Sequence, residues 1–166
     1  EYNDALKFST TISKHPVGIR VPNIWCELDN DNHTDFTKNM CVLSGSDVAI
    51  TAVGPMLKMA LEVAKDIKEK YQKDITVINP INVSNLDYET LDKLKENHKL
   101  IITLEDGELQ GGYGVNIASY LGADAIKVMN FGISKKFHTD FKAEELLAKC
   151  GMSKENLVNI IEGYLS

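Results

Sequence analysis

Short apolar runs alternate with amphipathic stretches along most of the chain from residue 40 onward. Apolar, β-branched runs predict strands, and apolar residues at helical spacing predict helices. The apolar runs cover residues 40–43, 48–53, 75–78, 100–104 and 125–129. The amphipathic stretches cover residues 56–67, 88–97 and 113–121. This alternation predicts an α/β domain of three layers (αβα), in which a mostly parallel five-stranded sheet lies between two layers of helices.

The most informative stretch is LIITLEDGELQGGYGVNIASYL, residues 100–121. Its continuous apolar run is typical of a strand that is covered on both faces in a parallel sheet. Glu105 and Asp106 are therefore predicted at the carboxyl end of that strand, with Gly107 as a turn residue and a helix that starts near Tyr113. Loops at this edge of an open α/β sheet are where ligands and partners meet the fold.

Three glycines, Gly111, Gly112 and Gly114, lie where this helix begins. One interpretation is a phosphate cradle, because a glycine-rich turn presents backbone N–H groups at the positive end of a helix. However, GGYG matches neither G-x-G-x-x-G nor a P-loop, and the segment EDGE would place three carboxylates beside the anion. The interpretation that we prefer is a tight turn, which lets the helix pack closely on the sheet and lets the loop face a partner.

The beginning of the chain has a different pattern. Apolar residues at helical spacing over residues 2–12 predict an amphipathic helix, and HPVGIRVP (residues 15–22) predicts a short strand bounded by prolines. One helix and one strand cannot bury themselves. We therefore interpret residues 1–26 as the tail of a preceding α/β domain, and the chain as a fragment of a longer protein. Residues 27–39, rich in Asp and Asn, are the predicted linker, and residues 40–166 the main domain.

Composition excludes several classes of function. The chain has 166 residues, 43% of them hydrophobic, which is enough for one full core. A formal net charge of −6 argues against a nucleic-acid or anionic-membrane surface. No apolar run approaches the roughly 20 residues that span a bilayer, and no signal-peptide pattern opens the chain, so we expect a cytoplasmic protein. Cysteines and histidines are dispersed without metal-ligand spacing, and we expect no metal site.

The segment LEDGELQGGYGVNIASYL resembles the V-E-D/E-x-x-x-x-G-G-x-G segment in the C-terminal domain of thiamine-diphosphate enzymes of the transketolase superfamily. Within it, the 1-deoxy-D-xylulose-5-phosphate synthases are the most similar, and β subunits of 2-oxoacid dehydrogenases carry a related segment. Further segments resemble the family in the same order: GSDVAITAVG, ITVINPINVSNLD, and the tail that starts with NFGISKKF. The resemblance covers essentially the whole chain.

The segment PVGIRVP resembles the family's P-x-A-x-R-Y-P-R-G strand, which ends the pyrimidine-binding domain. Arg20 matches the first arginine of that strand. The second arginine, which in the family clamps the phosphate of the sugar acceptor, falls on Asn23. An amide donates hydrogen bonds without a charge, so it grips a phosphate less firmly. The resemblance implies that Arg20 and Asn23 are the residues nearest to the substrate, a sugar phosphate or a 2-oxoacid.

In this family, thiamine diphosphate and Mg²⁺ are held by a G-D-G…N motif in one domain and by a pyrimidine-binding domain whose glutamate activates the cofactor. This chain contains neither segment. The resemblance thus implies no catalytic residue here, no cofactor on the chain alone, and a parent enzyme that transfers two-carbon units. It implies interface or helix-entry roles for Glu105 and Asp106 with the glycine loop. The implied partners are the remaining domains, or separate chains carrying them, within a homodimer.

Three alternatives stay open from the sequence. The parent could be a transketolase or the β subunit of a 2-oxoacid dehydrogenase. The chain could instead be a non-catalytic docking module of a split transketolase. It could also be a small α/β protein that binds a nucleotide with its glycine loop.

Overall fold

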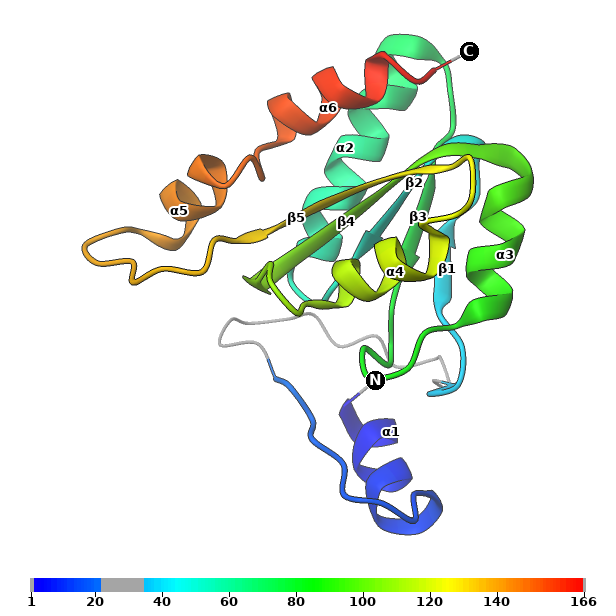
Figure 1. Cartoon of the computed structure of the whole chain (residues 1–166), viewed down its shortest axis with the longest axis vertical. Helices are drawn as coiled ribbons and strands as arrows, with labels where there is room; N and C mark the ends of the chain where they lie inside the picture. Colours follow the sequence, from blue (N-terminus) through cyan, green and yellow to red (C-terminus); the bar gives the residue numbers. More distant parts are fainter. Residues whose placement is uncertain (1, 22–34, 166) are drawn as a thin grey trace.

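The computed structural model describes residues 2–21 and 35–165 (Figure 1). At its centre lies a sheet of five strands, which are β1 (Met40–Leu43), β2 (Asp47–Ala52), β3 (Thr76–Asn79), β4 (His98–Glu108) and β5 (Lys127–Ile133). The strand order is β1-β3-β2-β4-β5. β1 runs antiparallel to β3, and all other neighbours are parallel. The predicted five-stranded, mostly parallel sheet is confirmed.

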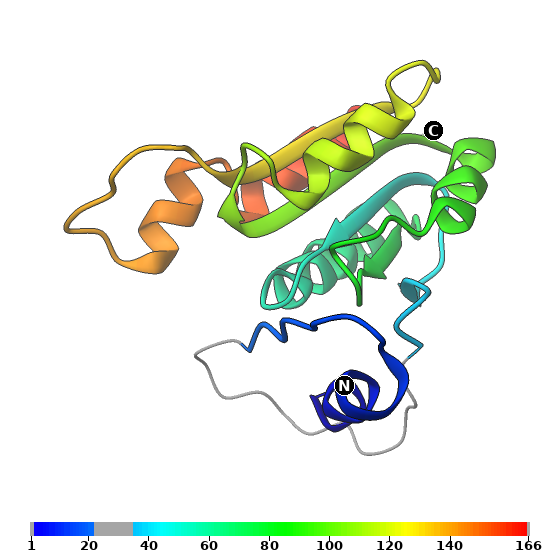
Figure 2. The same cartoon turned by 60° about the horizontal axis from the view of Figure 1, so that its bottom comes forward.

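Helices cover both faces of this sheet. They are α2 (Met56–Tyr71) and α6 (Lys154–Glu162) on one face, and α3 (Tyr88–Asn97) and α4 (Tyr113–Leu121) on the other (Figure 1, Figure 2). Successive strand residues point to opposite faces. Ile50 and Ile102 accordingly lie in the core beneath α2 and α6, whereas Ala49 and Ile101 lie in the core beneath α3 and α4. The three-layer arrangement is therefore confirmed.

The strands flanking the glycine loop differ in extent from the prediction. β4 runs from His98 to Glu108, beyond the predicted residues 100–104 at both ends. β5 spans Lys127–Ile133 instead of 125–129. The physical reason is mutual pairing: Leu100 lies opposite Lys127, and the ladder continues to the pair of Glu108 and Ile133.

After β5 the chain leaves the sheet. Residues 134–142 form a loop that extends beyond the body of the domain, and α5 (Ala143–Lys149) follows it and leads to α6 (Figure 1). The side chain of Phe137 in this loop is fully exposed. Among the described helices, none is long and apolar enough to cross a membrane.

The predicted helix at the start of the chain is present as α1 (Tyr2–Lys7), which continues into a π-helical turn, η1 (Phe8–Ile12). The strand predicted over residues 15–22 is wrong for its described part, residues 15–21. A strand needs a neighbour to complete its hydrogen bonds, and no strand of the described chain pairs with this segment. Residue 22 of the predicted strand lies outside the described residues, and so do residues 27–34 of the predicted linker.

Candidate functional site

The end of β4 carries an irregularity in its pairing with β5. Leu104 lies opposite Phe131 but Glu108 lies opposite Ile133, so residues 105–107 of β4 face a single residue of β5. We refer to residues 105–107 as the β4 bulge. Such bulges bend a strand and redirect its side chains. Gly107, predicted as a turn, lies inside the strand, and the turn to α4 comes after Glu108.

Glu105 points from the β4 bulge to the beginning of α4. Its side chain is buried, with 7% of the residue exposed. Its carboxylate accepts hydrogen bonds from the backbone N–H groups of Tyr113 and Gly114, both at 2.8 Å. These N–H groups belong to the first turn of α4, where backbone N–H groups have no acceptor within the helix. A negative carboxylate is also stabilised by the positive end of the helix dipole. Glu105 thus fills the position that a phosphate would take in a glycine-rich cradle.

The glycines of the loop allow this close approach. Gly111 has a positive φ of 78°, a conformation that favours glycine. A Cβ atom on Gly112 would lie 2.8 Å from the carboxylate oxygens of Glu105. A Cβ atom on Gly114 would lie 2.1 Å from Oγ1 of Thr103 on β4. The absence of side chains at these positions lets α4 begin directly against β4.

The other acidic residues at this edge are paired with cations from two separate segments. Asp106 Oδ1 lies 2.7 Å from Nη2 of Arg20, in the N-terminal segment. Glu108 forms an ion pair with Lys135, which follows β5, at 3.3 Å. The structure therefore brings together two of the predicted site residues, Arg20 and Asp106. Asn23, the other predicted substrate neighbour, lies outside the described residues.

Arg20 remains accessible in this arrangement. Its side chain is 62% exposed, and that of Asp106 is 25% exposed. The guanidinium fork carries five N–H donors, and one of its nitrogens is ion-paired with Asp106. Arg20 therefore offers further donors to solvent beside the carboxyl edge of the sheet, the edge where open α/β folds bind ligands.

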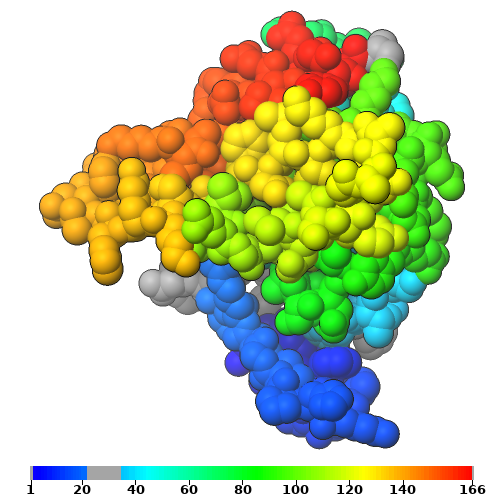
Figure 3. Space-filling model, viewed as in Figure 1, coloured from blue at the N-terminus to red at the C-terminus, as the bar shows by residue number. Residues whose placement is uncertain are grey.

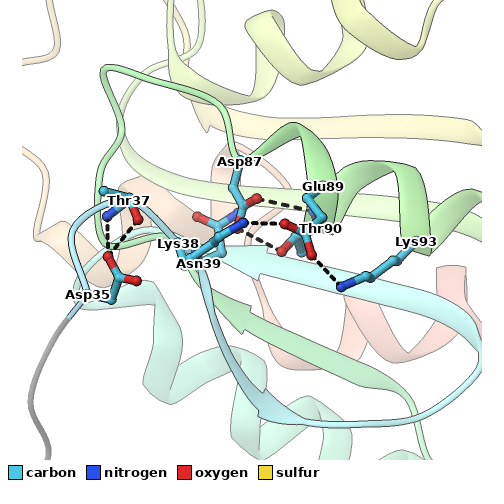
Figure 4. A network of polar contacts seen from close by, with 8 residues as sticks. All are labelled: Asp35, Thr37, Lys38, Asn39, Asp87, Glu89, Thr90 and Lys93. Atoms are coloured by element: carbon cyan, nitrogen blue, oxygen red, sulfur yellow. Dashed lines mark hydrogen bonds and ion pairs between the residues drawn. The ribbon is translucent and has the colours of Figure 1, made fainter.

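A second polar cluster, which the sequence did not predict, joins residues 35–39 to the beginning of α3 (Figure 4). Asp87 lies at its centre and is buried. Its carboxylate accepts hydrogen bonds from the Thr90 amide at 3.2 Å, the Thr90 hydroxyl at 2.7 Å and the Asn39 amide at 2.8 Å. Burial alone would raise the pKa of Asp87, but the hydrogen bonds from Asn39 and Thr90 outweigh it and lower the pKa.

Charged residues surround this cluster on its exposed side. Glu89 is hydrogen-bonded to Lys38 and, at 2.8 Å, to Lys93 (Figure 4). The hydrogen bond from Lys38 contributes most to lowering the pKa of Glu89 to about 2. The same contact raises the pKa of Lys38. Both groups are charged near neutral pH, and their opposite charges lie in contact.

A cavity of about 260 Å³ lies over this cluster, and its lining includes Phe8, Phe36, Lys38, Asn82 and Asp87. The rings of Phe8 and Phe36 stack with their centroids 5.0 Å apart. This contact ties the N-terminal helical segment to the main domain. Because the carboxylates here are already hydrogen-bonded or ion-paired within the chain, the cluster acts as a structural junction. The only local sign of it in the sequence is D-x-x-T, a helix N-cap pattern at Asp87.

Residues 2–21 and 35–165 contain no group of three or more His, Cys, Asp or Glu side chains that could hold a metal ion. At the carboxyl edge, Arg20 and the acidic side chains of β4 supply a chemistry of hydrogen bonding and charge pairing. It can position an anionic group or a neighbouring chain.

The chain belongs to the transketolase C-terminal domain family, whose model matches residues 39–157. This confirms the superfamily resemblance of the sequence. Among curated proteins, it is similar to 1-deoxy-D-xylulose-5-phosphate synthases. The synthase of Carboxydothermus hydrogenoformans is 32% identical over 147 residues, covering 86% of this chain and 24% of the relative. That of Alkaliphilus oremlandii is 29% identical over 174 residues, covering 100% of this chain and 27% of the relative.

Solved structures agree with this assignment. A split gene transketolase, described as an inactive β4 tetramer, has a TM-score of 0.72 and 25% identity, covering 87% of this chain and 46% of that one. A transketolase mutant from Pichia stipitis has a TM-score of 0.51 at 11% identity, covering 76% of this chain and 18% of that one, and shows the fold alone. The chain spans about a quarter of the length of the curated relatives that it matches.

Proposed function

We propose that this chain is the C-terminal part of a thiamine-diphosphate-dependent transferase of two-carbon units, of the 1-deoxy-D-xylulose-5-phosphate synthase or transketolase type. The observation that carries the proposal is the extent of the match. Synthases of this name align with 86% to 100% of the chain at about 30% identity. The aligned part makes up 24% to 27% of these relatives, and the matching family model is that of the transketolase C-terminal domain.

The residues present do not fit the diphosphate of the cofactor. The glycine loop is the one helix entry in the described chain that resembles a phosphate cradle, and the Glu105 carboxylate already accepts its N–H groups. The sequence also has no G-D-G…N segment. We therefore assign thiamine diphosphate and Mg²⁺ to the other parts of the enzyme. When bound there, the cofactor supplies the electron sink for the carbon–carbon chemistry.

This chain's own contribution is to shape the mouth of the active site and to make contacts within the assembly. Arg20, held by Asp106, presents a charged donor at the carboxyl edge of the sheet. We propose that Arg20 and Asn23 are the residues of this chain nearest to the substrate, which is a sugar phosphate or a 2-oxoacid. We further propose that the enzyme is a cytoplasmic homodimer.

A second candidate is a docking subunit of a split enzyme, whose cofactor-binding domains are on a separate polypeptide. The similarity to a split gene transketolase supports this possibility. A β subunit of a 2-oxoacid dehydrogenase is a related variant of the same arrangement. The C-terminal part of a single-chain enzyme and a docking subunit of a split enzyme share one prediction, which is that this chain functions only together with other domains.

The experiment is reconstitution. In one preparation the chain is expressed alone. In the other it is expressed together with the polypeptide of the source organism that carries a G-D-G…N segment. That polypeptide is encoded either by the same gene or by another. Both preparations receive thiamine diphosphate, Mg²⁺, pyruvate and glyceraldehyde 3-phosphate. We expect carbon dioxide release only from the combined preparation. Robust turnover by the chain alone would contradict the proposal, as would a combined preparation that is inactive with pyruvate and also with sugar donors.

An Arg20→Lys variant refines this test. Lysine keeps the charge but loses the planar fork. If Arg20 contacts the substrate, KM for the phosphorylated acceptor should rise while the assembly of the two polypeptides stays unchanged. A docking subunit without a substrate role would show normal kinetics with the same variant.

A further inference from the structure

Arg20 is the only arginine in the chain, which has 18 lysines and arginines in total. Arginine differs from lysine in its planar fork, which can bind a carboxylate or a phosphate through parallel hydrogen bonds. The guanidinium of Arg20 lies 2.7 Å from Oδ1 of Asp106, at the end of β4. The one side chain of the chain that has this geometry therefore lies at the carboxyl edge of the sheet.

The backbone that carries Arg20 is not part of the sheet. Residues 14–21 extend from the protruding N-terminal helix back to the body of the molecule (Figure 3). They form neither helix nor strand, and none of the described strands pairs with them. Side chains on such segments are positioned less precisely than those on helices or strands. The position of the guanidinium therefore depends on a contact with a rigid element.

Asp106 provides this contact from β4, which is paired on both sides, with β2 and with β5. Its Oδ1 atom is buried and, apart from the ion pair with Arg20, has no hydrogen-bond partner in the described chain. Burying a carboxylate oxygen without a donor is unfavourable, so the guanidinium compensates for its burial. The neighbouring Glu105 already accepts two N–H groups of α4.

The surroundings of this ion pair leave room for a ligand. A Cβ atom on Gly18, two residues before Arg20, would have no atom within 4 Å apart from its chain neighbours. The same holds for Gly107, which directly follows Asp106. The Arg20 side chain is 62% exposed and carries donors that one ion pair does not use. The guanidinium can thus contact Asp106 on one side and an anionic group on another.

We propose that Asp106 is the positioning residue of Arg20. It holds the guanidinium at the carboxyl edge of the sheet, and the remaining donors bind the anionic group of the substrate. The inference rests on the proposed function and deepens it, because it makes a carboxylate that does not touch the substrate a determinant of substrate affinity.

The sign of the effect on KM separates positioning from a simple effect of charge. Through its charge alone, Asp106 repels a phosphorylated substrate, so Asp106→Asn would lower KM. Loss of positioning acts in the opposite direction, because a mobile guanidinium has to be ordered when the substrate binds. In the reconstituted enzyme, we expect Asp106→Asn to raise KM for glyceraldehyde 3-phosphate by about fivefold, the scale of an exposed ion pair, and to leave kcat unchanged.

Glu108→Gln is the matched control. It also removes one carboxylate charge from the end of β4, but Glu108 is paired with Lys135 and not with Arg20. This variant should not raise KM. Combining Asp106→Asn with Arg20→Lys should raise KM by less than the product of the two single effects, because both changes act on one contact.

A second measurement needs no turnover. Because the chain contains a single arginine, it gives a single arginine Nε–Hε signal in an NMR spectrum. The heteronuclear nuclear Overhauser effect (NOE) of this signal reports how mobile the guanidinium is. In the chain alone, Asp106→Asn should lower the NOE towards the value of a free side chain, whereas Glu108→Gln should leave it unchanged.

An Asp106→Asn variant that keeps the wild-type NOE would overturn the proposal. So would a variant whose KM stays the same or falls, or a Glu108→Gln variant that has the same effects as Asp106→Asn. An inactive wild-type preparation would instead contradict the proposed function. In that case the NMR measurement would still decide whether Asp106 holds Arg20, so the two failures are distinguishable.

Discussion

A Cβ atom on Gly112 would lie 2.8 Å from both carboxylate oxygens of Glu105. The same carboxylate accepts the backbone N–H groups of Tyr113 and Gly114 at the beginning of α4. The carbonyl oxygen of Glu108 lies 2.9 Å from the same Cβ position, so a methyl group there has backbone on one side and a buried carboxylate on the other. Glu105 therefore reaches the helix because residue 112 has no side chain.

Replacing Gly112 by alanine should displace the Glu105 carboxylate and leave two buried N–H groups without an acceptor. We expect the free energy of unfolding to fall by about 2–4 kcal/mol, because each unsatisfied buried donor costs about 1–3 kcal/mol. Urea unfolding measures the change. Gly107→Ala is the matched control: a Cβ at this position of the β4 bulge has no atom within 4 Å. Equal losses in the two variants would refute the coupling between Gly112 and Glu105.

Glu105→Gln tests the same contact from the other side. The amide keeps one carbonyl oxygen as an acceptor but loses the charge and turns an N–H₂ group to the helix end, so we expect a loss of about 1–2 kcal/mol. The double variant with Gly112→Ala should lose less than the sum of the single losses, because both changes remove one interaction. Strict additivity in this double-mutant cycle would show that the residues act independently.

The alternation of apolar runs and amphipathic stretches was sufficient to predict the three-layer arrangement, the five strands of the sheet and the helices α2, α3 and α4, although not α5 and α6. It could not predict the β4 bulge, because the bulge depends on the pairing of residues 105–107 with β5, about 25 residues later in the sequence. Gly132 contributes from β5: a Cβ there would lie 3.0 Å from Cα of Leu109. The fit between these segments is tertiary, and hydrophobic periodicity carries no information about it.

The candidate site residues also differ in whether the local sequence pattern could predict their positions and contacts. The local pattern was enough to predict that Glu105 and Asp106 lie at the carboxyl end of a strand. The pairing of Asp106 with Arg20 joins segments 86 residues apart in the sequence, so it could not be read from spacing. The strand predicted over residues 15–22 failed for a related reason: the pattern indicates that a segment can be extended, but a ladder requires a partner strand.

Asp87 should be the most sensitive residue of the junction between residues 35–39 and α3. Asp87→Ala removes the cap of α3 and the acceptor of the Asn39 amide, and we expect a loss of about 2–3 kcal/mol. Hydrogen exchange at the Asn39 amide should accelerate, while exchange at the centre of β2 follows global stability only. Asp35→Ala is the control, since Asp35 is exposed and accepts hydrogen bonds from Thr37, two residues along the chain. An Asn39 amide that remains equally protected would contradict this role of Asp87.

The pKa of His98 determines one way in which the free energy of unfolding should depend on pH. Its Nδ1 lies 3.1 Å from the Leu94 carbonyl oxygen, which can only accept, so Nδ1 carries the proton and Nε2 accepts from the Thr76 hydroxyl at 2.8 Å. The Thr76 oxygen in turn accepts from the Gly45 amide. Burial lowers the pKa of His98, against weaker opposing effects of the Leu94 carbonyl and Asp47. The folded chain therefore favours the neutral ring.

Because the folded pKa of His98 lies below the unfolded value of about 6.5, the unfolded chain binds more protons between these two values. The stabilisation is fully present above about pH 6.5 and is lost as the pH falls through the folded pKa. Unfolding free energies measured between pH 8 and pH 5 should show this decline, and the difference curve against His98→Gln should isolate it. A flat difference curve, or one with the opposite slope, would contradict the prediction.

The last prediction concerns the nucleotide-binding alternative. A phosphate at the glycine loop would have to displace a buried carboxylate that already accepts two N–H groups at 2.8 Å. Calorimetric titration with ATP and with NAD should therefore give no saturable heat. Glu105→Ala is the informative variant, because it removes the competing carboxylate and leaves the glycines in place. If the wild-type chain bound either nucleotide and lost it on Gly112→Val, the loop would be a ligand site and the capping role of Glu105 would be wrong.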